Sequence, residues 1–242
     1  MEYFQYYLMG IILLPAIIFS VYAQIKVDSA YNSFMRVKTQ NGLSASQVAS
    51  KMLQKKDIFD VGVKRVAGRL TDYYSDKEKT VALSQDIYDS DSVAAVGIAM
   101  HEVGHAIQYA EGYKMVHFRN IMIRVSNISS VVLWPLVIIG LFLNLAVVGS
   151  GVIGSIFAWC GIGFFGIAVI LNLITLPVEF DASNRAKKLM EQENLLTAEE
   201  RIGAAKVLNA AAMTYVAALM VSVMNLIRFI LVVVMNSDRR RR

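Results

Sequence analysis

The residues best suited to chemistry in this sequence are two histidines four positions apart, His101 and His105, with Glu102 between them. The surrounding segment, 92–110, has helical apolar periodicity, so both imidazoles are predicted to lie on one helix face, about one turn apart. Two such imidazoles can bind one metal ion, with nitrogen–metal distances of about 2.0–2.1 Å. Glu102 lies about 100° around the helix, where it can accept a proton from a metal-bound water. The pattern predicts metal-assisted hydrolysis of a peptide bond, the alternatives being an idle metal site or two histidines that merely pack.

A catalytic metal site of this kind needs a third protein ligand and an open fourth position. Glu179 follows an apolar run that ends at Pro177, and a carboxylate beside a membrane end is costly unless it is solvated or paired. His117 and Glu111, twelve and six residues after His105, are the other candidates. Two predicted membrane crossings separate His105 from Glu179, so both would return to the same side of the membrane. That topology favours Glu179.

The composition indicates a membrane protein. Hydrophobic residues make up 56% of the 242 residues, charged residues make up 18%, and the mean hydropathy is +0.48. A soluble domain has about 45–50% apolar and about 25% charged residues. A single cysteine, Cys160, excludes a disulfide scaffold. The net charge of +5 includes the terminal run Arg239–Arg242, which suits anionic lipid head groups better than nucleic acid.

Four apolar stretches are each close to the length of about 20 residues that crosses a bilayer as a helix. The expected fold is a mainly α membrane protein with four transmembrane helices and a small α+β domain between the first and the second. The expected organisation is, in chain order, a transmembrane anchor (1–24), a catalytic domain with the two histidines (25–128), a transmembrane hairpin (129–177), a helical segment with the third ligand (178–211), a transmembrane helix (212–236) and a basic tail (237–242).

Details of the apolar stretches refine this expectation. Pro15 and Pro135 are predicted to kink two of the helices, and residues 149–151 are predicted to form the hairpin turn. A cleaved signal peptide is the rival interpretation of the first stretch, but residues 1–7 contain Glu2 and no Lys or Arg. Basic residues near the predicted membrane ends are concentrated in the two long polar segments, 24–128 and 178–211, so these segments are expected to face the cytoplasm. The terminal arginines argue against this orientation.

The catalytic domain is expected to combine helices and strands. Helix N-caps are predicted at Ser44 or Ser46 and at Ser90 or Ser92, and Gly112 is the predicted end of the second helix. The predicted elements are a helix over 44–55, strands over 61–70 and 80–83 joined by a turn at 75–79, and a helix over 92–110.

The segments His101–Gln108, Glu111–Tyr113 and Leu176–Ser183 resemble the YugP-like neutral zinc metallopeptidases of bacterial membranes, and the resemblance spans nearly the whole chain. It implies a gluzincin with a zincin-like catalytic domain, in which Zn²⁺ is bound by His101, His105 and Glu179 and Glu102 is the general base. The chain is more distantly similar to the HtpX and CAAX-prenyl-protease type, whose third-ligand pattern is Glu-x-x-Ala-Asp. Glu179 and Ala182 match that pattern, but Ser183 stands where it has Asp.

The sequence leaves the groups around the metal open. Metal-bound histidines give their other N–H to a carboxylate or carbonyl, and the candidate carboxylates are Asp72, Asp86 and Asp181. The candidate oxyanion donors are Tyr109, Tyr113, His117, Arg185 and Tyr215. The resemblance to gluzincins also implies that residues 80–84 form an edge strand on which an extended substrate pairs.

We therefore expect an integral protein of a bacterial plasma membrane that acts as a zinc-dependent endopeptidase on membrane-associated polypeptides, in quality control or processing of membrane proteins. The alternative is a non-proteolytic membrane scaffold or assembly factor that retains a zinc site. A transporter is disfavoured because the apolar stretches carry almost no ionisable group. No nucleic-acid partner is expected.

Overall fold

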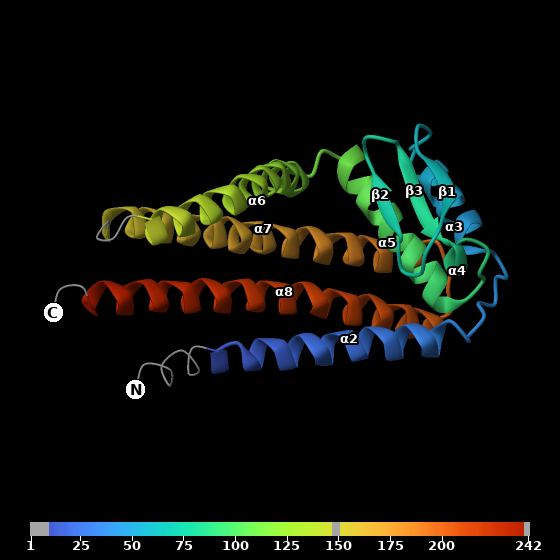
Figure 1. The fold of residues 1–242 in the computed structure, drawn as a ribbon. Coiled ribbons are helices and arrows are strands. Elements are labelled where there is room, and N and C mark those ends of the chain that lie inside the picture. The colour runs from blue at the N-terminus through green and yellow to red at the C-terminus, as the bar shows by residue number, and fades with distance from the viewer. Residues whose placement is uncertain (1–9, 147–150, 240–242) are drawn as a thin grey trace. The chain divides into compact units, whose positions relative to one another are not determined.

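The structure is a computed structural model that describes residues 10–146 and 151–239 (Figure 1). Its contacts divide the chain into two units. The unit that we call the mixed unit contains helices and a sheet and comprises Tyr22–Val116 and Leu176–Thr214. The helical unit comprises the described residues of Met1–Val21, His117–Thr175 and Tyr215–Arg242. The predicted anchor start (1–9), part of the predicted hairpin turn (149 and 150) and the end of the basic tail (240–242) lie outside the described residues.

The mixed unit is built on a three-stranded sheet with the order β1-β3-β2. Strand β1 (Gly62–Val66) pairs parallel with β3 (Thr80–Ser84), and β2 (Tyr73–Ser75) pairs antiparallel with β3. The helices of this unit are α3 (Ala45–Lys55), α4 (Gln85–Tyr88) and α5 (Val93–Ala110), with parts of α2 (Leu14–Phe34), α7 (Gly151–Gln192) and α8 (Ala198–Arg239). Helix α6 (Lys114–Ala146) begins at the end of this unit.

The strand topology differs from the prediction in two respects. The sequence predicts that a turn at 75–79 joins the strands over 61–70 and 80–83, but β1 and β3 are parallel, and the turn before β3 connects it to β2. The expectation that residues 80–84 form an edge strand is wrong, because β3 lies in the middle of the sheet. Strand β2 is only three residues long, too short to show an alternating pattern. The outer strands of this sheet are β1 and β2.

Helix α5 lies in the core of the mixed unit, between the sheet and other helices. Its residues Val96, Met100 and Val103 are fully buried and belong to one hydrophobic cluster with Leu83 of β3 and Met52 of α3. Burial of several large apolar side chains, at about 1.5–3 kcal/mol each, fixes the helix rigidly. The prediction of this helix from residues 92–110 is confirmed.

Local capping signals set the ends of the helices as expected. Ser44 caps α3 in a capping box with Gln47, and Ser92 caps α5 by accepting a hydrogen bond from the Ala95 N–H. Gly112 adopts a positive φ of 67° just after α5 ends, the left-handed conformation that glycine adopts at low cost.

Helix α7 continues through Pro177 without a break. The predicted boundary between the hairpin (129–177) and the third-ligand segment (178–211) therefore lies inside one helix. Proline in a helix interior costs one backbone hydrogen bond but does not always end the helix. As a result, Glu179 is held on the same helix as the apolar run that precedes it.

Two of the described helices contain segments long and apolar enough to cross a membrane. They lie in Trp159–Gln192 of α7, where a stretch of 18 residues has a mean hydropathy of 2.1, and in Ala198–Leu231 of α8, where the corresponding value is 1.8. Helix α2 begins at Leu14, so Pro15 lies in its first turn, where proline is tolerated. Gly10 and Ile11 are also helical, and a turn at Ile12 and Leu13 interrupts the helix just before this proline. Helix α6 covers the first part of the predicted transmembrane hairpin (129–177), up to Ala146.

Candidate metal centre

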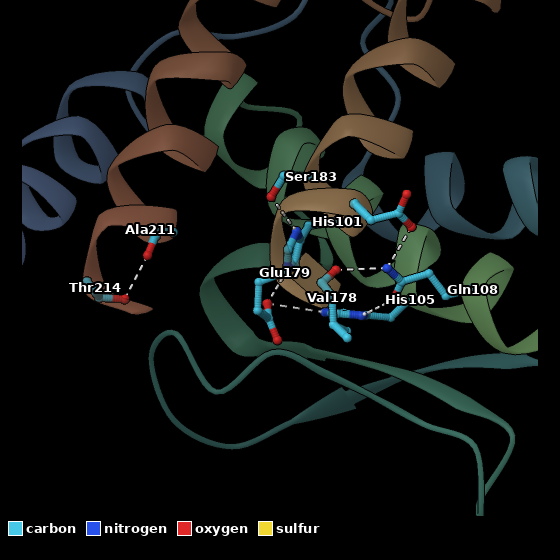
Figure 2. A network of polar contacts seen from close by, with 9 residues as sticks. His101, His105, Gln108, Val178, Glu179, Ser183, Ala211 and Thr214 are labelled. Atoms are coloured by element: carbon cyan, nitrogen blue, oxygen red, sulfur yellow. Dashed lines mark hydrogen bonds and ion pairs between the residues drawn. The ribbon is translucent and has the colours of Figure 1, made fainter. Parts of the chain in front are cut away.

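Two helices of the mixed unit bring three potential metal ligands together (Figure 2). His101 and His105 lie on α5, and Glu179 lies on α7. Glu179 Oε2 is 3.3 Å from His101 Nε2 and 3.5 Å from His105 Nε2. One ligand atom from each of the three residues lies within 4.8 Å of the others. His101, His105 and Glu179 are the group of side chains among the described residues that could hold a metal ion. The rival candidates for the third ligand, Glu111 and His117, do not belong to this group.

The absence of a side chain at Gly104 lets the two helices approach closely enough to form this group. A Cβ atom at this position would lie 2.6 Å from the backbone oxygen of Ala182 on α7. The facing positions of α7 carry small or β-branched residues, and both Val178 and Ala182 are fully buried. The close contact lies one residue before His105 on α5 and three residues after Glu179 on α7, so it sets the separation of the ligands.

The three donor atoms suit a zinc ion. In a tetrahedral site with bonds of about 2.0–2.1 Å, neighbouring donor atoms are about 3.3 Å apart. The separations of Glu179 Oε2 from the imidazole Nε2 atoms of His101 and His105, 3.3 and 3.5 Å, agree with this value. Two imidazole nitrogens and one carboxylate oxygen are a ligand set of catalytic zinc sites, which keep the fourth position for water.

Gln108 fixes the orientation of His105. Its side chain is fully buried and its amide nitrogen donates to the backbone oxygen of Val178 and to Asp181 Oδ2, both at 2.8 Å. The amide oxygen must then face His105 Nδ1, 2.9 Å away, and can only accept the proton of that nitrogen. With the Nδ1 proton directed at Gln108, Nε2 is the nitrogen of His105 that remains to bind a metal, and it faces Glu179 (Figure 2).

Ser183 contacts the other histidine. Its hydroxyl lies 3.1 Å from His101 Nδ1 and comes from α7, one helical turn after Glu179. This hydroxyl can accept the Nδ1 proton in the way that a carboxylate would. Both histidines are thus oriented by neutral partners, an amide and a hydroxyl.

Two of the three carboxylates expected to orient the histidines, Asp72 and Asp181, have other partners. Asp181 reaches His105 only through Gln108, and it accepts a hydrogen bond of 2.5 Å from Arg185 Nε. Arg185 Nη1 also donates to Glu111 at 2.5 Å, which pairs this oxyanion candidate with two carboxylates. Asp72 accepts hydrogen bonds from the backbone N–H of Ser84 at 2.7 Å and from the Ser84 hydroxyl at 3.1 Å.

Burial changes the protonation of the groups in the centre. Burial raises the pKa of Glu102 above its usual value, and the nearby charges of His101 and His105 offset part of this effect. Burial also lowers the pKa of His105, but the hydrogen bond to Glu179 and the charge of Glu102 outweigh it, so the pKa of His105 is raised. The raised pKa of Glu102 suits a carboxylate that must hold a proton taken from water, because a more basic group is a better proton acceptor.

Sequence reasoning missed Gln108 and Ser183, although their spacing contained a signal. Gln108 is three residues after His105, and Ser183 is four residues after Glu179. Side chains three or four positions apart on a helix are neighbours. The partners that these side chains need, however, lie on the other helix, so the spacing alone could not identify them.

Comparison with known proteins agrees with this geometry. Residues 9–234 match the model of a protein family described as "Putative neutral zinc metallopeptidase". The chain belongs to this zinc metallopeptidase family. It is also 38% identical over 221 residues to the "Putative membrane protease YugP" of Bacillus subtilis (strain 168). The aligned region covers 90% of this chain and 93% of that protein. No solved structure matches the chain significantly.

Membership of the family assigns zinc as the cofactor, and the cluster of His101, His105 and Glu179 fits that metal. The similarity to a protein named as a membrane protease also agrees with the apolar segments of α7 and α8.

Proposed function

We propose that this metallopeptidase is a membrane-embedded, zinc-dependent endopeptidase of the gluzincin type, with His101, His105 and Glu179 as zinc ligands. The observation that carries the proposal is the convergence of two imidazoles from α5 and one carboxylate from α7 on a single point. This ligand set leaves one coordination position for water. The buried carboxylate of Glu102, next to one ligand on the same helix, completes the set of groups that peptide hydrolysis requires.

The residues of the centre divide the work of hydrolysis. Zinc held by His101, His105 and Glu179 would supply Lewis acidity, which lowers the pKa of water to about 7. The carboxylate of Glu102 would accept a proton from the attacking water and would give it to the leaving amine. Gln108 and Ser183 keep the lone pairs of the two histidine Nε2 atoms directed at the metal.

A short outer strand is the proposed binding site for an extended substrate. Strand β3 is paired on both sides, and the N–H of its last residue, Ser84, is bound by Asp72. Strand β2 has only one partner in the sheet and contacts α5, where Tyr74 of β2 lies 5.3 Å from the ring of Tyr109. We propose that the substrate backbone pairs with the outer edge of β2. We also propose that the substrate is a membrane-associated polypeptide that the enzyme cleaves in quality control or processing of membrane proteins.

The proposal is tested by separating metal binding from catalysis. Purified Glu102→Gln protein should keep about one zinc per chain but lose cleavage of an unfolded polypeptide by about 10²-fold or more, because it lacks the proton acceptor. Glu179→Ala should lose both zinc and cleavage. Glu199→Gln, at an exposed position in the first turn of α8, is the matched control and should keep both.

The same experiment addresses the alternative of a non-proteolytic scaffold. If the zinc-loaded wild-type protein cleaves no polypeptide in a membrane extract, while it binds zinc through the three ligands, the peptidase proposal fails. Cleavage that is unchanged in Glu102→Gln would contradict the proposed mechanism. Mapping of cleavage sites in membranes that contain the wild-type or the Glu102→Gln protein would identify the substrates.

A further inference from the structure

A groove of about 590 Å³ lies between α2 and α8 in the mixed unit, and none of the residues that line it belongs to the candidate metal centre. The groove lies along α2, from Tyr22 to Phe34, and along α8, from Lys206 to Met213. Its polar lining consists of Lys26, Ser29, Ser33, Lys206 and Asn209. The groove therefore offers two cations and several hydrogen-bond donors, and it has no carboxylate in its lining.

The two lysines of the groove are held by aromatic rings rather than by acidic side chains. Lys26 Nζ lies 5.5 Å from the ring centroid of Tyr22, and Lys206 Nζ lies 5.9 Å from that of Phe34. Neither lysine forms an ion pair with a carboxylate among the described residues. Asp28, the nearest acidic residue on α2, accepts a hydrogen bond from a glutamine of the same helix at 3.4 Å. The positive charge of the groove is thus not neutralised by the part of the chain that the structure describes.

A third lysine adds to this charge. Lys187 of α7 donates a hydrogen bond of 2.7 Å to Asn209 Oδ1. Because this contact occupies the amide oxygen, the remaining polar group of Asn209 is its NH₂ donor. The hydroxyls of Ser29 and Ser33 can also donate. Cations and donors of this kind bind an anion such as a phosphodiester.

The position of the two lysines in the chain indicates that the anion is a lipid head group. Lys26 is the only charged residue of α2 between its start at Leu14 and residue 26, and α8 has no charged residue between Lys206 and Arg228. Both lysines are therefore the last charges before a long apolar helix segment. Lysines at such positions extend toward the lipid head groups, while their helices continue into hydrocarbon.

The apolar part of the groove supports the same source. Ala210 and Met213 line it on α8, in the part of that helix that has no charged residue between Lys206 and Arg228. A soluble anion would gain nothing from these side chains, whereas the glycerol and first acyl carbons of a lipid would bury apolar surface against them.

We propose that this groove binds an anionic phospholipid, with its phosphodiester near Lys26 and Lys206 and its glycerol and first acyl carbons against Ala210 and Met213. The proposal depends on membrane insertion of these helices and not on peptidase activity. Gly203 of α8 packs against Val93 of α5, and Ala204 packs against Gly97. A lipid bound between α2 and α8 would therefore contact the same helix, α8, that packs against α5.

The test compares two lipids with the same acyl chains on the purified full-length protein in detergent. Dioleoylphosphatidylglycerol is anionic and dioleoylphosphatidylcholine is zwitterionic; bound lipid is measured by native mass spectrometry and the midpoint of thermal unfolding is measured in parallel. The anionic lipid should bind more tightly and raise the midpoint. Each lysine contributes about 5-fold in affinity, so Lys26→Gln/Lys206→Gln should bind the anionic lipid roughly 30-fold more weakly.

Matched variants separate this effect from a general loss of charge or fold. Lys51→Gln/Lys56→Gln removes the same charge from exposed positions on and next to α3 and should bind the anionic lipid as the wild type does. Lys26→Arg/Lys206→Arg keeps the charge and should bind within a few-fold of the wild type.

Three outcomes would overturn the proposal. These are equal binding of the two lipids, unchanged binding of the anionic lipid by Lys26→Gln/Lys206→Gln, or an equal rise of the unfolding midpoint with inorganic phosphate alone. None of these outcomes would affect the peptidase proposal, because the groove shares no residue with the metal centre.

Discussion

The side chains next to the metal ligands fix the tautomer and the orientation of each histidine. The Nδ1 atom of His105 faces an amide oxygen, and that of His101 faces a hydroxyl. Asp181 is separated from His105 by Gln108 and paired with Arg185. The imidazoles are thus oriented without an additional negative charge in direct contact with them. This arrangement makes each orienting side chain separately testable.

Gln108→Leu should weaken zinc binding by about 10- to 100-fold, because His105 loses the acceptor that fixes its tautomer and orientation. The variant also removes the side-chain hydrogen bond to the buried Val178 oxygen, so thermal stability should fall. Gln108→Glu keeps an acceptor and should retain more zinc affinity than Gln108→Leu. The dissociation constant is measured by competition with a chelator, and Gln54→Leu, at an exposed position on α3, is the control. Wild-type affinity in Gln108→Leu would show that this amide does not orient the ligand.

Ser183→Ala should have a smaller effect of the same kind on His101, because a hydroxyl at 3.1 Å is a single neutral contact. We expect zinc affinity to fall by a few-fold, about 5- to 10-fold for a contact worth about 1 kcal/mol. Ser183→Asp places a carboxylate at this position and should raise the affinity above that of Ser183→Ala. A Ser183→Asp protein that binds zinc no better than Ser183→Ala would contradict a direct role in orienting His101.

At the scale of elements, the site depends on how closely α5 and α7 approach each other. The histidine pair is local to one helix, but Glu179 comes from a helix that begins far away in the chain. The two helices meet where Gly104 faces the backbone of Ala182. The third ligand is therefore in place only if the helices pack at this distance.

Gly104→Ala should separate the ligands. The new Cβ would lie 2.6 Å from the Ala182 backbone oxygen, which cannot move without shifting α7. Overpacking of this kind costs about 1–3 kcal/mol, and the shift should weaken zinc binding as well as lower the thermal midpoint. Gly163→Ala is the matched control because its Cβ would meet no atom within 4 Å. Equal zinc content and stability in the two variants would mean that the α5–α7 contact does not set the geometry of the site.

The elements show which parts of the structure the sequence could predict. The α5 helix, its cap at Ser92 and its end before Gly112 follow from signals within a few residues of one another, and they are confirmed. The order of the strands depends on pairing between distant segments, and β2 is too short for any period to be visible. For that reason the predicted edge position of β3 was wrong. The convergence of Glu179 with the histidines was predicted from the number of crossings between them, a property of the whole chain.

At the scale of the whole molecule, α7 and α8 each combine a polar part in the mixed unit with an apolar part in the helical unit. The basic residues next to the apolar stretches are concentrated in the polar segments 24–128 and 178–211, which form most of the mixed unit. The positive-inside rule predicts that these segments face the cytoplasm. The four arginines at the end of the chain are the opposing signal, so the orientation needs a direct measurement.

Cysteine labelling tests this orientation and the crossing by α8 together. In a Cys160→Ser background, Lys51→Cys places a thiol at an exposed position on α3, and a second variant carries a cysteine added after Arg242. A membrane-impermeant maleimide should label the Lys51→Cys protein only after cells are permeabilised, because a cytoplasmic mixed unit is shielded by the bilayer. The added terminal cysteine should react in intact cells, since the apolar segment of α8 lies between the two positions. Labelling of Lys51→Cys in intact cells would reverse the orientation, and equal shielding of both cysteines would contradict a membrane crossing by α8.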